Sequence, residues 1–326
     1  MDATVVYNIP HQQGLQVFIA IYFYLTGLSA GSFVISVVAY LLGKTEYKPL
    51  GKIGAFLAPI LLVIAPILLI TDLGKPMRFF YLFFNVNPTS PLTWGTFLLT
   101  IYPISCLIYL YYVLKGNQKM IKTFGIIGIP LAISVHGYTG FVLALAKFSP
   151  IWNNSLMPLL WLISAMVSGI GLVIFVAIVM EKVFSVSLAK FAGEMSTETS
   201  TGKMLAETAA SSTGVMPLNE MLGGVGKYLA GFIIFDLFLV FSEILVLLTE
   251  SEEAAALAAS LLTGDYSFLF LGLEILLGAL IPLFLLLHPR TSRSLAAQTV
   301  AAVLVLIGVM TMRYIVIIGG QSVPFN

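Results

Sequence analysis

Residues 155–180 read SLMPLLWLISAMVSGIGLVIFVAIVM and contain no charged side chain. The hydrocarbon core of a bilayer is about 30 Å thick, and a helix needs roughly 20 apolar residues to cross it. The stretch can therefore span a membrane as one helix. The whole chain has the same character, because 59% of its 326 residues are hydrophobic and only 10% are charged, whereas soluble domains carry about 25% charged residues. This composition excludes a soluble globule.

Seven further runs have comparable length and polarity. They are 16–43, 53–71, 91–114, 123–146, 228–248, 266–287 and 295–319. Backbone groups must be hydrogen-bonded inside a bilayer, and the sequence lacks the short alternating segments of a membrane barrel. We therefore predict an all-α integral membrane protein with eight transmembrane helices. A long Ser/Thr/Gly-containing linker over about 181–226 suggests two four-helix bundles, one within residues 1–150 and one within 151–326.

The positively charged residues are divided unevenly between the two sides of the predicted spans. Most of the 16 Lys and Arg fall in the odd-numbered connections, whereas the even-numbered ones hold only Lys75, Arg78 and Lys147. Because Lys and Arg in short loops favour the cytoplasmic side, we expect both termini to face outward, toward the periplasm, from the cytoplasmic (inner) membrane. The first residues lack the pattern of a secretory signal peptide, so we expect no cleaved segment before the first span.

Composition also limits the chemistry that this chain can perform. Its net charge of +1 provides no basic field for nucleic acid. Its single cysteine, Cys106, cannot hold an iron–sulfur cluster alone, and its three histidines, His11, His136 and His288, are not arranged for a two-haem cytochrome b. We expect no haem, no iron–sulfur cluster and no metal site in this chain, so electrons must come from a partner subunit.

Several polar side chains of the first four spans converge near the outer surface. Tyr22 lies at the start of the 16–43 run, His136 and Tyr138 lie in the outer half of the 123–146 run, and Asp72 ends the 53–71 run. A quinone ring is flat and apolar with two carbonyl oxygens, and it suits an aromatic pocket with hydrogen-bond donors and a proton route. These residues predict such a pocket, with Asp72 exchanging protons with the outer water. The remaining candidates for this site are Arg78 and Trp94. The alternative for His136 is a hydrogen-bonded packing residue.

A second group of ionisable residues falls in the last three spans. Asp236 and Glu243 lie seven residues apart, hence on one helix face, while Glu274 and Arg313 belong to the next two spans. Charges at membrane depth are costly and mark candidate sites. Three interpretations stay open, namely a proton path, a buried ion pair between Arg313 and Glu243 or Glu274, and a binding site for a transported cation.

The outer connections offer a docking surface. The connection over 72–91 is rich in aromatic residues and proline, which predicts a folded hairpin at the outer interface. The second docking segment is the connection over 147–154. The candidate contact residues are Phe79, Phe80, Asn85, Asn87, Trp152 and Asn153.

Four of these segments together resemble the NrfD / polysulfide reductase membrane-subunit family. They are IAIYFYLTGLSAG (19–31), DLGKPMRFFYLFFNVNPTSPLTWG (72–95), YTGFVLALAKFSPIWNNSLMPLLWLISAMVSG (138–169) and RYIVIIGGQ (313–321). The resemblance implies a haem-free subunit of eight helices that reacts with menaquinone or ubiquinone. It also implies two partners, an outward-facing ferredoxin-like iron–sulfur subunit and a catalytic subunit with molybdopterin or another centre.

The resemblance further implies that Tyr22 and Tyr138 hold the quinone head. The polysulfide reductase member has a histidine at the position of Tyr22, and many relatives have arginine at the position of Lys75. We therefore expect a quinone-reactive oxidoreductase subunit involved in anaerobic respiration. The alternatives are an ion-translocating or solute-carrying protein that uses the acidic residues of the 228–248 and 266–287 spans, and a membrane anchor without a site, against which the intramembrane charges argue.

Overall fold

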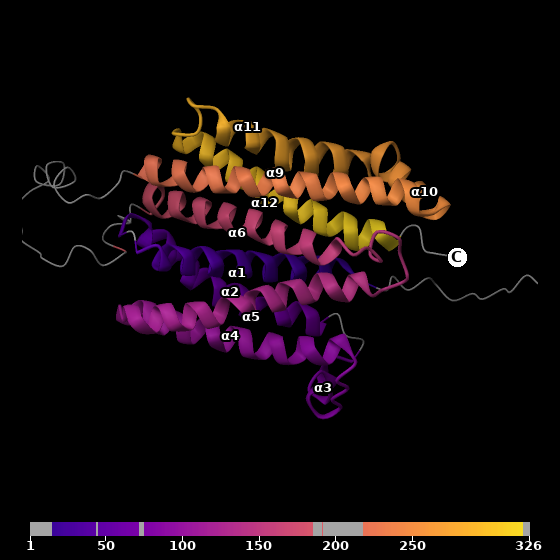
Figure 1. Cartoon of the computed structure of the whole chain (residues 1–326), viewed down its shortest axis with the longest axis horizontal. Coiled ribbons are helices and arrows are strands. Elements are labelled where there is room, and N and C mark those ends of the chain that lie inside the picture. The colour runs from indigo at the N-terminus through magenta and orange to yellow at the C-terminus, as the bar shows by residue number, and fades with distance from the viewer. Residues whose placement is uncertain (1–14, 44, 72–74, 185–190, 192–217, 322–326) are drawn as a thin grey trace, which may run out of the picture.

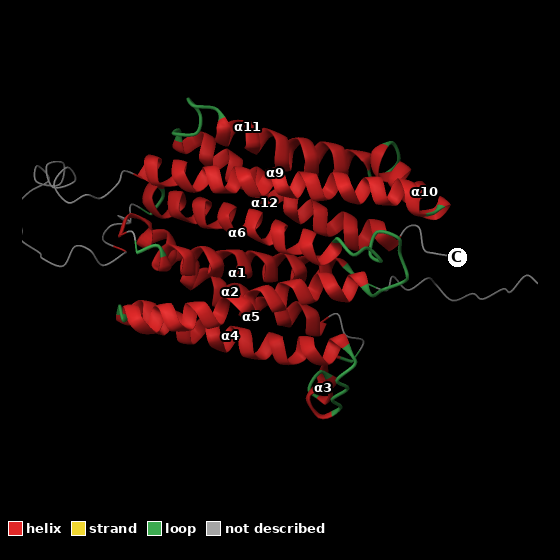
Figure 2. Cartoon of the chain, viewed as in Figure 1, coloured by secondary structure: helices red, strands yellow, loops and turns green. Residues whose placement is uncertain are grey.

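The computed structural model describes residues 15–43, 45–71, 75–184, 191 and 218–321. Within these residues, eight helices are long and apolar enough to cross a membrane, which confirms the predicted number of spans. They lie side by side along the long axis of the molecule (Figure 1), and the described residues contain no strand (Figure 2). The spans are α1 (Val17–Leu41), α2 (Lys48–Thr71), α4 (Pro91–Lys115), α5 (Gln118–Ala144), α6 (Met157–Lys182), α9 (Leu218–Glu250), the continuous pair η3 (Phe268–Leu280) and α11 (Ile281–Leu287), and α12 (Leu295–Ile318).

Five short elements lie at the ends of the spans. They are η1 (Thr45–Tyr47), η2 (Pro76–Arg78), α3 (Tyr81–Phe84), α10 (Glu252–Leu262) and η4 (Gly319–Gln321). The elements η2 and α3 give the predicted outer hairpin a folded form over its described residues. Figure 1 shows α3 and α10 at the same end of the molecule.

Several boundaries differ from the sequence-based prediction. Helices α2 and α5 each begin five residues before the predicted runs, and α6 ends at Lys182, inside the predicted linker. Helix α9 begins at Leu218, so residues 218–226, which we predict as linker, are helical. Of the other predicted linker residues, 185–190 and 192–217 lie outside the described part of the chain. Helix α10 is an additional element that the sequence analysis does not predict. Its start has a conventional signal, because the side chain of Ser251 accepts a hydrogen bond from the backbone N–H of Ala254 at 3.1 Å.

Close backbone contacts join α1 to α6. A Cβ atom added at Gly31 would collide with the backbone oxygen of Ala165, and one added at Gly169 would collide with Gly31. Small residues in a membrane allow helix backbones to approach in this way. Gly31 of α1 and Gly169 of α6 therefore serve close helix packing.

The helices of the first and second halves of the chain share their packing. In the first half, α1 contacts α2 and α5, and α4 contacts the same two helices. In the second half, α9 and α12 each contact α6 and the η3–α11 span. Contacts also cross between the halves, because α6 packs against α1, α2 and α5, and α12 packs against α1. The apolar clusters at the two ends of the molecule both contain residues from both halves. The division into two four-helix bundles over 1–150 and 151–326 therefore stays a prediction.

Both described ends of the chain lie together. The backbone N–H of Leu15 donates to Oε1 of Gln321 at 3.0 Å, and Nε2 of Gln321 donates to the backbone oxygen of Leu15 at 2.8 Å. The first and last spans thus have their terminal ends at the same side, as an even number of spans requires. The outward orientation of this side stays a prediction.

Candidate functional site

Arg313 is the centre of a polar cluster buried where α1, α5, α6 and α12 meet. Its side chain has no exposed surface. Its Nη2 atom donates to Oγ of Ser164 at 2.6 Å, and its guanidinium carbon lies 3.9 Å from the centroid of the Trp161 ring. Ser164 and Trp161 are three residues apart on α6 and therefore share one face. Helix α6 thus offers the guanidinium both a hydroxyl oxygen and an aromatic face.

His136 of α5 completes this group, which we call the Arg313 cluster (Arg313, His136, Trp161 and Ser164). Nη2 of Arg313 lies 3.3 Å from Nε2 of His136. Because a guanidinium only donates hydrogen bonds, Nε2 accepts and the neutral imidazole carries its proton on Nδ1. The imidazole is fully buried against Gly27 of α1, where an added Cβ would lie 2.9 Å from its Cε1 atom. Gly27 therefore makes room for this ring.

Four buried N–H groups of the Arg313 cluster have no acceptor among the described residues. They are Nε and Nη1 of Arg313, Nδ1 of His136 and Nε1 of Trp161. A buried donor without an acceptor costs about 1–3 kcal/mol, and buried water commonly satisfies such groups. The cluster is chemically suited to bind an oxygen atom, whether of water or of a ligand.

The predicted tyrosine pair lies near the start of α1 and the end of α5. Tyr22 is buried, Tyr138 is half-buried, and the two phenols are within electrostatic range of each other. The Tyr138 ring fills the space beside Gly95 of α4, where a Cβ would collide with its hydroxyl. Neither hydroxyl makes a hydrogen bond with a described residue. Both O–H groups are therefore free to bind a ligand oxygen.

Aromatic contacts connect the tyrosine pair to the Arg313 cluster. The ring centroids of Tyr22 and Phe23 are 5.2 Å apart, and those of Phe23 and Trp161 are 6.1 Å apart with an interplanar angle of 78°. Trp161 in turn lies against Arg313. Two ring contacts therefore separate the Tyr22 ring from the aromatic face that carries the guanidinium.

The predicted quinone residues are not all in one place. His136 and Tyr138 are two residues apart on α5, which turns their side chains to roughly opposite sides of the helix. His136 joins the Arg313 cluster, while Tyr138 faces α4. Asp72 lies outside the described residues. Arg78 is exposed on the outer hairpin, and Trp94 is exposed in the first turn of α4, where its indole N–H donates to the backbone oxygen of Pro88 in the hairpin at 2.8 Å.

Most of the predicted docking residues are at the surface. Those that are exposed are Phe79, Phe80, Asn85, Asn87 and Asn153. Trp152 differs, because only 5% of its surface is exposed and its indole N–H donates to the backbone oxygen of Val316 at 2.6 Å. The structure places Trp152 in the core, where it contributes packing instead of a contact surface.

The acidic residues of the last spans form a second group. Glu243 and Glu274 are buried, Asp236 is half-buried, and the three carboxyl groups lie within electrostatic range of one another. The described residues form no ion pair between Arg313 and a carboxylate, because Nη2 of Arg313 bonds to Ser164 and Nε and Nη1 have no partner. The buried ion pair of Arg313 with Glu243 or Glu274, one of the three interpretations that the sequence leaves open, is not formed among the described residues.

Sequence analysis does not single out Trp161 and Ser164 as site residues. The sequence does contain a signal for them. An arginine inside one span needs partners from another span. The segment WLIS (161–164) offers an indole and a hydroxyl on one face of an uncharged helix. The choice among all such segments depends on tertiary contacts.

Comparison with known proteins agrees with this description. The sequence model of the family described as "Polysulphide reductase, NrfD" matches residues 10–324. The C subunit of selenate reductase from Mesobacillus selenatarsenatis is 26% identical, over 94% of this chain and 74% of that protein. The C chain of polysulfide reductase from Wolinella succinogenes is 32% identical, over 47% of this chain and 55% of that protein. The Hdr-like menaquinol oxidoreductase integral membrane subunit of Archaeoglobus fulgidus is 29% identical, over 46% of this chain and 38% of that protein. The matches to the last two proteins thus span about half of their length or less.

Proposed function

Because this chain belongs to the NrfD polysulphide reductase family, we propose that it is the quinone-reactive membrane subunit of a respiratory oxidoreductase with several subunits. In this role it exchanges electrons between the quinone pool of the cytoplasmic membrane and an iron–sulfur partner subunit. The names of its relatives, which include a selenate reductase subunit and a menaquinol oxidoreductase membrane subunit, support this proposal. The observation that carries it is the pair of hydroxyls of Tyr22 and Tyr138, which have no partner among the described residues.

The residues of this chain suit the binding of a quinone head. A quinone, menaquinone or ubiquinone, accepts two electrons and two protons when it is bound and reduced. The hydroxyls of Tyr22 and Tyr138 would donate hydrogen bonds to a carbonyl oxygen of this group, and the aromatic rings around Tyr22 would exclude water. The guanidinium of Arg313 is separated from the Tyr22 ring by two ring contacts. Its positive charge would stabilise the negative charge that a quinone head gains when it is reduced there.

The electrons must arrive from another subunit. The chain has one cysteine, and its described residues contain no group of three or more His, Cys, Asp or Glu that could hold a metal ion. We propose that a ferredoxin-like iron–sulfur subunit docks on the outer surface formed by Phe79, Phe80, Asn85, Asn87 and Asn153. This surface lies at the end of the molecule where α1 and α5 carry the tyrosine pair, which keeps the electron-transfer distance short. A catalytic subunit with molybdopterin or another centre then binds that partner.

The substitution Tyr138→Phe tests the proposed site. It keeps the ring beside Gly95 and removes one hydrogen bond to the quinone, which is worth about 1–1.5 kcal/mol, or near tenfold in affinity. We expect the apparent KM for quinol to rise by about this factor in the assembled complex. The measurement is steady-state quinol turnover in membranes.

Two controls separate binding from assembly. Tyr228→Phe changes a tyrosine of α9 that is 67% exposed, and we expect unchanged kinetics. Activity of the partner subunits with an artificial dye should be unaffected in both variants. An unchanged affinity and rate with quinol in Tyr138→Phe would contradict the assignment of the pocket.

The alternative function is an ion-translocating or solute-carrying protein. The two functions differ in what accompanies the purified chain. A quinone-reactive subunit retains quinone and an iron–sulfur protein in mild detergent, whereas a carrier retains neither. Mass spectrometry of the co-purifying proteins and extraction of bound quinone distinguish them.

A further inference from the structure

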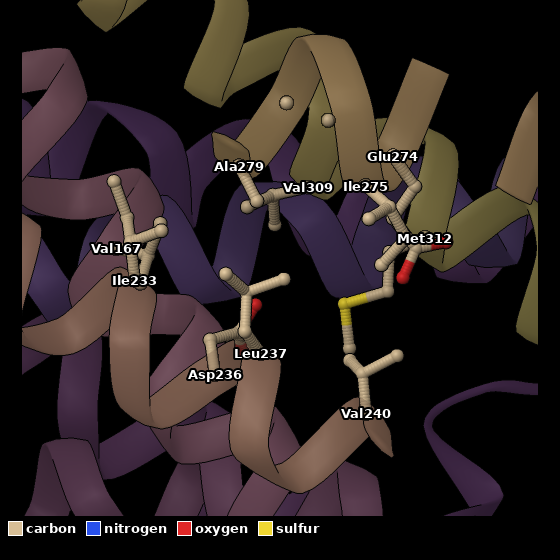
Figure 3. A pocket seen from close by; sticks show the side chains of 12 residues that line it. Val167, Ile233, Asp236, Leu237, Val240, Glu274, Ile275, Ala279, Val309 and Met312 are labelled. Atoms are coloured by element: carbon tan, nitrogen blue, oxygen red, sulfur yellow. The ribbon is translucent and has the colours of Figure 1, made fainter. Parts of the chain in front are cut away.

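A cavity of about 20 Å³ lies between α6, α9, η3 and α12, in the second half of the chain. Its walls are mostly apolar, but Asp236 of α9 and Glu274 of η3 line it from opposite sides (Figure 3). One water molecule needs a cavity of roughly 10–15 Å³ or more on this measure. The cavity therefore has room for one water molecule and for no larger ligand.

Asp236 and Glu274, which line this cavity, and Glu243 nearby on α9 have carboxyl oxygens without hydrogen-bond partners among the described residues. Glu274 is 9% exposed and bonds to no described residue. Oδ1 of Asp236 and Oε1 of Glu243 are buried without a partner among the described residues, and Glu243 is only 6% exposed. A buried carboxylate normally accepts several hydrogen bonds. These oxygens are therefore available to a proton and to a water molecule in the cavity.

The charges around the cavity do not balance if all three acids are ionised. Helix α9 contributes Asp236 and Glu243, η3 contributes Glu274, and α12 contributes Arg313, which is within electrostatic range of Asp236 and Glu274. Helix α6 lines the cavity with Val167 and adds no charge there. Like charges in a medium of low dielectric constant repel strongly, and two carboxyl groups that share a site retain a proton.

The backbone keeps this cavity small. Gly278 of η3 and Gly308 of α12 both line it, and a Cβ added to either would collide with the other. The two helices are thus in backbone contact at one wall. The segment Phe268–Leu280, which carries Glu274, is π-helical.

We propose that Asp236 and Glu274 bind a proton between them, together with one water molecule in the cavity, and that Glu243 is the neighbouring acceptor toward the outer end of α9. Asp236 and Glu243 are separated by about 10.5 Å along the helix axis, a distance that water-assisted transfer must bridge. This site does not depend on the proposed quinone chemistry.

Labelling with dicyclohexylcarbodiimide tests the proposal on the purified full-length chain. The reagent is apolar and modifies carboxyl groups that carry a proton, and mass spectrometry locates the modified residue. At pH 7 we expect labelling of Glu274 or Asp236 and at least tenfold less labelling of Glu220, which is exposed on the same helix α9. Asp236→Asn removes the negative charge beside Glu274 and leaves the positive charge of Arg313. Glu274 should then lose its proton more readily, so we expect its labelling to fall severalfold. Glu220→Gln should leave the labelling of Glu274 unchanged.

Three outcomes would overturn the proposal. They are no labelling of Asp236 or Glu274, equal labelling of Glu220, and protection of the site by sodium ions at constant pH, which would indicate a metal cation as the ligand. Glu274→Gln provides a second variant, in which the label at that position must disappear. Because the assay does not use quinol, its failure is distinguishable from failure of the quinone site, which the kinetics of Tyr138→Phe report.

Discussion

Arg313 is held by neutral groups instead of an opposite charge. A hydrogen bond from a charged group contributes about 1.5–3 kcal/mol, and a desolvated cation–π contact contributes about 2 kcal/mol or more. Ser164 and Trp161 provide one of each. These contacts offset part of the desolvation free energy of the guanidinium, and no described carboxylate lies within hydrogen-bonding distance of it. The positive charge can therefore stabilise negative charge on a neighbouring group, which suits the electron exchange proposed for this chain.

Substitution of Gly27 tests how tightly this cluster is packed. In Gly27→Ala the new methyl group would meet Cε1 of His136 at 2.9 Å and Nε2 at 3.2 Å, so the imidazole must shift from its position beside Arg313. Overpacking of this kind costs about 1–3 kcal/mol. We expect a lower thermal unfolding temperature for the purified chain in detergent and slower quinol turnover in the complex.

Gly231→Ala is the matched control for this substitution. Nothing lies within 4 Å of a Cβ at Gly231, and alanine is the better helix former by about 1 kcal/mol. This variant should be as stable as the natural chain or slightly more stable. If Gly27→Ala behaved in the same way, the imidazole would be loosely held and the arrangement of the Arg313 cluster would have to be revised.

At this scale, the sequence reveals which polar residues matter but not how they combine. Arg313, His136, Tyr22 and Tyr138 stand out because polar groups are rare in apolar spans. The sequence analysis assigns His136 and Tyr138 to one pocket, although two residues along one helix turn their side chains to roughly opposite sides. The contact between His136 and Arg313 joins residues 177 positions apart, and it depends on the rotation of two helices that no local pattern determines.

At the scale of elements, the spans are predictable because the bilayer imposes their length and polarity. All eight apolar runs correspond to long helices among the described residues. The exceptions are segments that the bilayer does not constrain. Helix α9 extends to Leu218 beyond the apolar run, and α10 is too short to span and has an amphipathic sequence.

The outer hairpin is the element on which we expect the iron–sulfur partner to dock. Phe80 is 41% exposed there, beside the similarly exposed Phe79. Phe80→Ser should reduce the amount of partner that co-purifies with the chain, because it removes apolar contact area from the proposed interface. The measurement is the ratio of partner to chain after affinity purification in mild detergent.

A phenylalanine at the opposite end of the molecule provides the control. Phe184 follows α6 and is 68% exposed, so Phe184→Ser makes the same chemical change away from the hairpin. It should leave the ratio of partner to chain unchanged. Equal loss of partner in both variants would indicate a general defect, and retention of the partner in Phe80→Ser would remove Phe80 from the docking surface.

At the scale of the whole molecule, α1 and α6 are the helices through which the two halves of the chain act on each other. Gly31 and Gly169 bring their backbones together, and the Arg313 cluster lies beside this contact, with α5 and α12 completing it. The tyrosine pair belongs to the first half and the proton-binding cavity to the second. A displacement of α6 would therefore change the packing around both sites.

The orientation of the molecule decides which side of the membrane receives the partner. Lys48, Lys52 and Lys115 lie at the end opposite to the described termini, together with the basic loop between α11 and α12 that contains Arg290 and Arg293. Since basic loops favour the cytoplasm, we expect the termini and the outer hairpin to face the periplasm. A reporter enzyme that is active only in the periplasm should therefore be active when fused after Asn326 and inactive when fused after Lys115, with a cytoplasm-only reporter giving the reverse pattern. The opposite result would place the hairpin in the cytoplasm, and the iron–sulfur partner would then have to be sought on that side.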